Sequence, residues 1–177
     1  MANGTLKVQN IQTSSGSGTI TLGQSGETIT VPTGTTVSGA MANTPSFGAY
    51  GTVAQSVTSG TWTKINFDTE EFDTNNNFAS SRFTPTVAGY YQINACTASS
   101  GTGNSGWATA IYKNGTNIKL AYVPNASIGC VVFVGSVVYL NGSTDYVEIY
   151  CINNNATQNN QVGQNYSYFQ AFRNIGA

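Results

Sequence analysis

The chain has 177 residues, a formal net charge of −1 and only 7% charged residues, whereas soluble domains usually carry roughly 25%. Its six lysines and arginines form no cluster, so the sequence lacks the basic footprint of a protein that binds nucleic acid or an anionic membrane surface. No apolar run approaches the ~18 residues needed to span a bilayer. We therefore expect no nucleic-acid partner and no membrane insertion.

Residues 1–45 contain no aromatic residue and consist of short alternating pieces separated by glycines or Pro32. Two of these pieces, T-I-T-L-G at 19–23 and T-I-T-V-P at 28–32, repeat at a fixed spacing. Pieces this short bury little apolar surface within one chain, so we interpret the segment as an extended β-type stem in which three copies intertwine. A flexible Gly/Ser/Thr linker is the competing interpretation. The residues expected to pack in the stem or to anchor it to a particle are Leu6, Val8, Ile20, Leu22, Ile29, Val31 and Val37.

From Ser46 onward the composition changes and aromatic residues appear. No segment shows an apolar stripe with a period of 3.6, so we expect almost no helix. The Asn114-Gly115 pair, between two alternating runs, predicts a hairpin, and Asn141-Gly142 separates the next two runs in a similar way. Regular strand spacing with turn residues between predicts an all-β head over residues 46–177, a jelly-roll sandwich of about ten antiparallel strands in two sheets. The expected strands lie near 47–58, 61–68, 82–84, 90–98, 106–112, 117–123, 129–140, 145–152 and 166–173.

The run V-V-F-V-G-S-V-V-Y-L at 131–140 is apolar at both parities. A strand with one wet face alternates, so this pattern predicts burial on both faces. One face fills the core, and the other needs a cover that a second copy of the chain supplies most simply. Tyrosine suits such a contact because its ring buries area while its hydroxyl keeps a partner. The residues expected at a trimer interface or in the core are Tyr90, Val131, Phe133, Val137, Tyr139, Tyr146, Tyr150 and Phe169.

A set of motifs in residues 46–177 follows one order. The central motif is F-x-P-x-x-x-G-x-Y-x-I, formed by Phe83, Pro85, Gly89, Tyr91 and Ile93. The others are I-N-F-D at 65–68, K-N-G at 113–115, the spaced residues Leu140, Gly142, Asp145 and Val147, and Y-F-Q-A-F at 168–172. In this order they resemble the globular head of complement subcomponent q, whose jelly roll is shared with tumour necrosis factor. The resemblance implies a homotrimer with a recognition or structural role and no catalysis.

The stem departs from that family because no Gly-X-Y collagen repeat precedes the head. It resembles instead the short structural proteins of tailed bacteriophages. This resemblance implies a virion location and a homotrimeric appendage, a fibre tip that attaches to host-surface glycan. The alternative is a head fibre or a capsid or tail decoration protein, purely structural, that binds other virion proteins through residues 1–45.

Catalysis is not expected, because the chain has no histidine and therefore lacks the usual general base and the common metal ligand. Its one carboxylate cluster is Asp68, Glu70, Glu71 and Asp73. A solvated turn is the interpretation that we favour for it, over a Ca²⁺ site or a glycosidase pair. We expect no cofactor.

Two long polar segments, 97–105 and 153–165, read as surface loops. The functional alternative is a carbohydrate-facing rim, because amide side chains both donate and accept hydrogen bonds and aromatic rings stack on sugars. The candidate glycan contacts are Trp107, Tyr112 and Tyr122. The odd number of cysteines, Cys96, Cys130 and Cys151, within apolar runs predicts buried thiols rather than a disulfide framework.

Overall fold

The computed structural model describes residues 11, 20–22, 24–35, 44–101, 105–126, 129–154 and 157–174. The chain divides into two units, Met1–Val37 and Ser38–Ala177, and each is described by itself. In the first unit the described residues form no strand, and four predicted stem residues, Ile20, Leu22, Ile29 and Val31, are exposed. The other three, Leu6, Val8 and Val37, lie outside the described residues. The intertwined stem therefore stays a prediction.

The second unit is built from strands, and none of its described residues is helical, as the sequence predicted. The strands are β1 (Ser46–Tyr50), β2 (Ser56–Val57), β3 (Thr63–Lys64), β4 (Thr69–Asp73), β5 (Phe78–Ala79), β6 (Arg82–Phe83), β7 (Gly89–Ser99), β8 (Ser105–Lys113), β9 (Thr116–Ala126), β10 (Val131–Leu140), β11 (Val147–Asn153), β12 (Gln158–Gln161) and β13 (Tyr168–Arg173).

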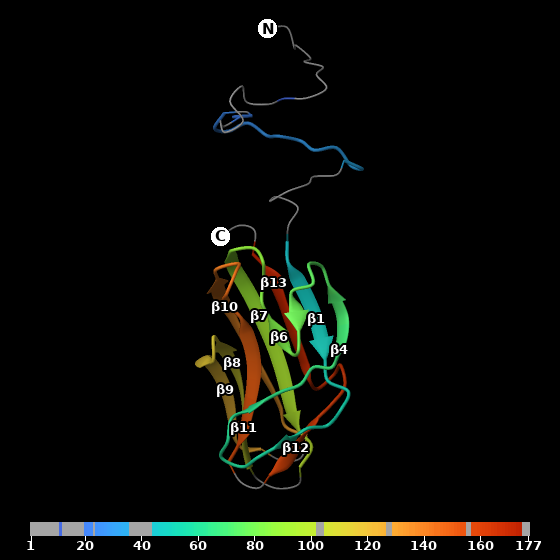
Figure 1. The fold of residues 1–177 in the computed structure, drawn as a ribbon, viewed down its shortest axis with the longest axis vertical. Coiled ribbons are helices and arrows are strands. Elements are labelled where there is room, and N and C mark those ends of the chain that lie inside the picture. The colour runs from blue at the N-terminus through green and yellow to red at the C-terminus, as the bar shows by residue number, and fades with distance from the viewer. Residues whose placement is uncertain are drawn as a thin grey trace. The chain divides into compact units, whose positions relative to one another are not determined.

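Two antiparallel sheets make up this head (Figure 1). In the first sheet β7 pairs with β10 on one side and with β13 and β12 on the other, and β1 and β4 continue beyond β13. The second sheet runs β5-β6-β11-β8-β9, with β3 also paired to β11. The predicted all-β sandwich of two sheets is confirmed. The sequence missed β4, β5 and β12, and β12 lies inside the segment that we expected to be a loop.

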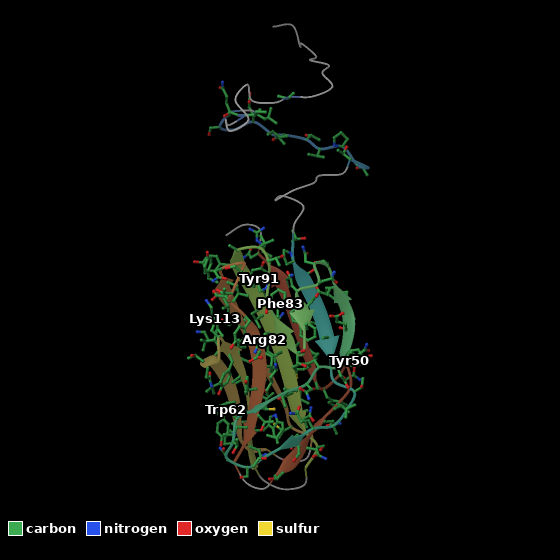
Figure 2. The ribbon with its side chains drawn as sticks, viewed as in Figure 1. Tyr50, Trp62, Arg82, Phe83, Tyr91 and Lys113 are labelled. Carbon is green, nitrogen blue, oxygen red and sulfur yellow. The ribbon has the colours of Figure 1, made fainter. Side chains whose placement is uncertain are left out.

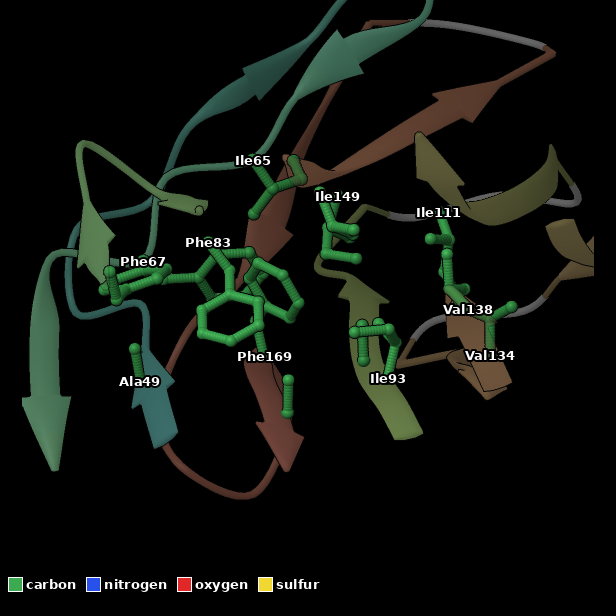
Figure 3. Close-up of a cluster of buried hydrophobic side chains, with 14 of the residues drawn as sticks. Ala49, Ile65, Phe67, Phe83, Ile93, Ile111, Val134, Val138, Ile149 and Phe169 are labelled. Carbon is green, nitrogen blue, oxygen red and sulfur yellow. The ribbon is translucent and has the colours of Figure 1, made fainter. Parts of the chain in front are cut away.

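The core lies between the two sheets, as Figure 3 shows. Aliphatic side chains such as Ile93 of β7, Val134 of β10, Ile111 of β8 and Ile149 of β11 meet there from both layers. Beside them lies a cluster of aromatic rings around Phe47, whose centroid is 4.6 to 4.8 Å from those of its three nearest partners, Phe78, Phe83 and Phe169. Cys96 and Cys151 are buried free thiols, as predicted, and Cys130 is a free thiol that is only half-buried.

Two Asn-Gly pairs form turns of different kinds. Asn114 and Gly115 both have positive φ (51° and 77°) and join β8 to β9 as a two-residue hairpin, so that prediction is confirmed. The Asn141-Gly142 loop differs, because the strands it joins, β10 and β11, belong to different sheets. Its polar side chain organises the crossing: Asn141 Oδ1 accepts bonds from three consecutive backbone N–H groups, Ser143, Thr144 and Asp145.

Candidate functional site

The first candidate surface is the outward side of β10. Its inward residues, including Val132, Val134, Val138 and Leu140, are buried. Its outward residues are about half exposed, at 47% for Val131, 53% for Phe133, 52% for Val137 and 49% for Tyr139. The predicted burial on both faces is therefore not met within one chain, since one side of the strand is open.

Neighbouring strands extend this surface. Tyr139 lies opposite Tyr90 of β7, with the ring centroids 5.4 Å apart in an edge-to-face contact. Val137 lies opposite Gln92 of β7, which pairs on its other side with Phe172 of β13. We call this surface the apolar face; its half-exposed members are Phe72, Tyr90, Val131, Phe133, Val137, Tyr139 and Phe172.

Two glycines let aromatic rings lie flat on the apolar face. A Cβ added to Gly48 of β1 would lie 2.9 Å from the ring of Phe72. A Cβ added to Gly135 of β10 would lie 3.1 Å from the ring of Phe133. Larger residues at these positions would push the rings away from the sheet, so the two glycines allow the rings to pack against it.

The remaining predicted interface or core residues lie elsewhere. Phe169 is fully buried in the core. Tyr146 directly precedes β11 and its ring packs 3.9 Å from the guanidinium of Arg82. Tyr150 lies on β11 and stacks on Tyr112 of β8 at 4.1 Å. The structure does not bring these three residues together with the half-exposed residues of β10.

The outward side of the second sheet also holds a buried carboxylate. Glu148 of β11 is 3% exposed, and its Oε1 accepts from Lys64 Nζ at 2.6 Å and from Arg82 Nε at 2.9 Å (Figure 2 labels Arg82). Burial by itself raises the pKa of Glu148, but the hydrogen bonds and positive charges of Lys64 and Arg82 outweigh it and hold that pKa below its ordinary value. Sequence reasoning missed this cluster because its members lie 66 and 84 residues apart.

Three of the four carboxylates of the predicted cluster bind separate partners. Asp68 accepts from the backbone N–H and the hydroxyl of Thr52 at 2.6 and 2.9 Å. Asp73 accepts from the N–H groups of Asn75 and Phe78, and Glu71 accepts from Gln164. Among the described residues no group of three or more His, Cys, Asp or Glu is placed to hold a metal ion. The contacts made by Asp73 are those of a turn.

Of the three candidate glycan contacts, one lies in the core and two lie at or beside a surface groove. Trp107 is fully buried and its Nε1 donates to Thr97 Oγ1 at 2.9 Å. Its ring is closed to a sugar, so our expectation for this residue is wrong. Tyr122 is 47% exposed and lines a groove of about 320 Å³ on the outward side of the second sheet. Tyr112 lies beside Trp62, another residue of that groove, with the two ring centroids 5.8 Å apart.

The comparisons with known proteins bear on the fold. No protein-family model matches the sequence, and no curated protein matches it. No described helix is long and apolar enough to cross a membrane.

Three solved structures resemble the head. The globular domain of zebrafish complement 1qA protein is 19% identical with a TM-score of 0.56, covering 73% of this chain and 99% of its own. Eiger TNF from S. frugiperda is 8% identical with a TM-score of 0.55, covering 76% and 93%. Vertex protein P5 of phage PRD1 is 15% identical with a TM-score of 0.54, covering 74% and 96%. The head thus has the jelly-roll fold of the complement 1q globular domain and the tumour necrosis factor family, a fold that a phage vertex protein also has.

Proposed function

We propose that this protein is a homotrimeric virion appendage of a bacteriophage, a fibre tip whose head attaches to host-surface glycan. The observation that carries the assembly is the apolar face. Monomeric soluble proteins rarely expose large contiguous apolar patches, and such patches mark interaction sites. Covering the exposed half of a residue such as Val137 or Phe133 contributes on the order of 1 kcal/mol, and one chain offers several such residues side by side.

Another copy of the chain is the partner that fits this surface. The surface residues of β7 and β10 at its centre are Tyr90, Gln92 and Asn94, and Val131, Phe133, Gly135, Val137 and Tyr139. None is charged, so three identical faces meet at a common axis without bringing like charges together. The resemblance to the complement head supports three as the number of copies.

The virion location is supported by the likeness to the PRD1 vertex protein. The first unit adds a second reason. Leu22 and Ile29 are 59% and 60% exposed there, and contact with other copies or with other virion proteins would cover them. Residues 1–45 are the proposed anchor.

The attachment role is supported by the aromatic groove on the second sheet. It lies on the sheet opposite the apolar face, so it stays open when that face is covered. A head fibre or capsid decoration protein is the second candidate, and what favours it is that the phage protein with this fold is a vertex protein.

The assembly is tested by multi-angle light scattering of the full chain. We expect the mass of three chains, stable on dilution, and a single chain's mass for Phe133→Asp combined with Val137→Asp. Val53→Asp is the matched control, because Val53 is 67% exposed on a loop. A dilution-stable wild-type species of one chain's mass would refute the assembly. Glycan-array binding tests attachment, and absence of binding together with labelling of the capsid lattice would favour decoration.

A further inference from the structure

The groove on the second sheet is a trough whose floor is Ala108 of β8. The neighbouring outward residues of β8, Gly106 and Ala110, are also small. On one side, Tyr122 and Leu120 of β9 lie opposite Ala108 and Ala110. On the other side, Ile152 of β11 also lies opposite Ala108. The trough is lined by Trp62, Ala108, Leu120, Tyr122, Ile152 and Asn154.

One end of the trough is fixed in position. The phenol of Tyr122 lies over Gly106 so closely that any Cβ there would overlap the ring. Asn154 holds the same end, since its N–H donates to Gly106 O and its Nδ2 donates to Tyr122 Oη, both at 3.1 Å. The hydroxyl of Tyr122 and the amide of Asn154 therefore form a pre-positioned polar pair.

The chemistry of this pair suits a hydroxylated ligand. Tyr122 Oη accepts from Asn154, so its own proton is left to donate, while Asn154 Oδ1 is an acceptor at the same end. The rest of the lining is aromatic or aliphatic, namely Trp62, Ala108, Leu120 and Ile152. Such a surface matches a ring with one apolar C–H face and a hydroxyl edge.

The charge and size of the trough restrict the class of ligand that it can bind. No lining residue is charged, and Lys64 and Arg82 on the same sheet both bond to Glu148. A ligand carboxylate, phosphate or ammonium would lose its hydration without a counter-charge. The volume of about 320 Å³ is at the low end of the roughly 300–1,000 Å³ of small-molecule sites, which is room for a single ring with its substituents.

We propose that this trough binds one neutral hexopyranose residue of a glycan. The sugar's apolar face packs against Trp62 and Tyr122, and its hydroxyls bond to Tyr122 Oη and Asn154 Oδ1. The inference rests on the proposed attachment role and assigns its binding site. Each copy in a trimer presents one trough, so weak single contacts add up on a surface dense in glycan.

The test uses the full chain and follows tryptophan fluorescence during titration with methyl α-D-glucopyranoside, methyl α-D-mannopyranoside, methyl β-D-galactopyranoside and N-acetylglucosamine. Glucuronic acid and glucosamine are the charged counterparts. The variants are Trp62→Phe, Tyr122→Phe and Tyr122→Ala. The matched control is Tyr166→Ala, because Tyr166 is another exposed tyrosine and lies outside the trough. Thermal unfolding of each variant checks that it is folded, and a glycan array run in parallel reports binding anywhere on the protein.

We expect at least one neutral glycoside to give a saturable change in emission that Trp62→Phe abolishes, since buried Trp107 is the only other tryptophan. Tyr122→Ala should weaken binding roughly tenfold or more, Tyr122→Phe by less, and Tyr166→Ala not at all. If the array shows glycan binding that Tyr122→Ala leaves intact, the trough is refuted and the attachment role stands. If the wild type binds no glycan, the proposed binding site and the proposed attachment role are both refuted. Binding of glucuronic acid or glucosamine in preference to the neutral sugars would refute the neutral class.

Discussion

Gly142, in the loop between β10 and β11, lies against the backbone of Ala88, in the turn that precedes β7. A Cβ on Gly142 would overlap the amide nitrogen of Ala88 and lie 2.6 Å from the carbonyl carbon of Val87. The same turn is held from the other side by Tyr91, whose hydroxyl donates to Val87 O at 2.6 Å. Tyr91 is fully buried, and burial raises its pKa to about 12. The two turns at this end of the head therefore support each other through backbone contact.

Replacing Gly142 by Ala should lower the free energy of unfolding by about 3 kcal/mol or more, because the new methyl overlaps backbone and the φ of +72° disfavours a side chain. Gly129→Ala is the matched control, since Gly129 has a φ of +76° but nothing within 4 Å of the added Cβ. The control should lose only about 1–2 kcal/mol. Urea unfolding compares the two, and equal losses would show that the contact with Ala88 has no energetic weight.

In the hairpin between β5 and β6, glycine substitutions at two adjacent serines should affect stability differently. Ser80 and Ser81 both have left-handed backbone, with φ of 51° and 57°. Ser80→Gly should be neutral or stabilise by up to about 1 kcal/mol by relieving that conformation. Ser81→Gly should instead destabilise by about 1–3 kcal/mol, because it removes the Oγ that accepts from the buried N–H of Phe67 at 2.8 Å. Thermal denaturation distinguishes them, and a stabilised Ser81→Gly protein would contradict the role of that hydrogen bond.

Glu148→Gln should destabilise the head at neutral pH by about 1–2 kcal/mol, a figure reduced for the partial exposure of Lys64 and Arg82. The pKa of Glu148 is lower in the folded than in the unfolded chain. Its contribution is therefore complete above the ordinary value of 4.5 and disappears as the pH falls through the folded pKa.

Unfolding measured across pH 3–8 should accordingly show the wild type and Glu148→Gln converging in acid. Glu70→Gln is the control, because Glu70 is exposed. A difference between wild type and Glu148→Gln that stays constant down to pH 3 would contradict the ion pairs as its cause.

Thr97 connects two layers of the core. Its hydroxyl accepts from Trp107 Nε1 at 2.9 Å and lies 2.6 Å from Thr109 Oγ1, which donates to Val132 O at 3.0 Å. Thr97→Val should cost about 1–3 kcal/mol because it leaves the buried indole N–H without an acceptor. Thr97→Ser keeps the hydroxyl and should cost less. Denaturant unfolding followed by tryptophan emission measures both, and equal losses would assign the effect to packing.

The sequence predicted the parts of this fold that depend on local pattern. Alternating apolar residues located β7, a continuous apolar run located β10, and Asn114-Gly115 located the hairpin between β8 and β9, since each signal lies within one short segment. The Ser80-Ser81 hairpin carries no such residue signal, because serine is not a residue that left-handed turns require. The Glu148 cluster depends on contacts between distant segments.

Strand β8 explains why the sequence misplaced Trp107. Its inward residues include Trp107 and Ile111, and its outward ones are Gly106, Ala108 and Ala110. Between Gly106 and Tyr112 neither parity carries a charge, so period-two alternation does not say which face points out. The same ambiguity hid Ala108, the floor of the trough, because its sequence context is that of an ordinary core residue. For residues 131–140 the sequence pattern predicted burial of both faces of the strand. Within one chain only the inward face is buried.

The small residues of β8 leave the shape of the trough to be set by the side chains of the neighbouring strands. This strand is bonded to β11 on one side and β9 on the other, whereas Leu120 and Tyr122 stand on β9, the last strand of its sheet. Exchange of those two side chains would change the shape and polarity of the trough without replacing a side chain of the core. Under the proposed function, variants with a different ligand preference can therefore arise from changes on this edge strand alone.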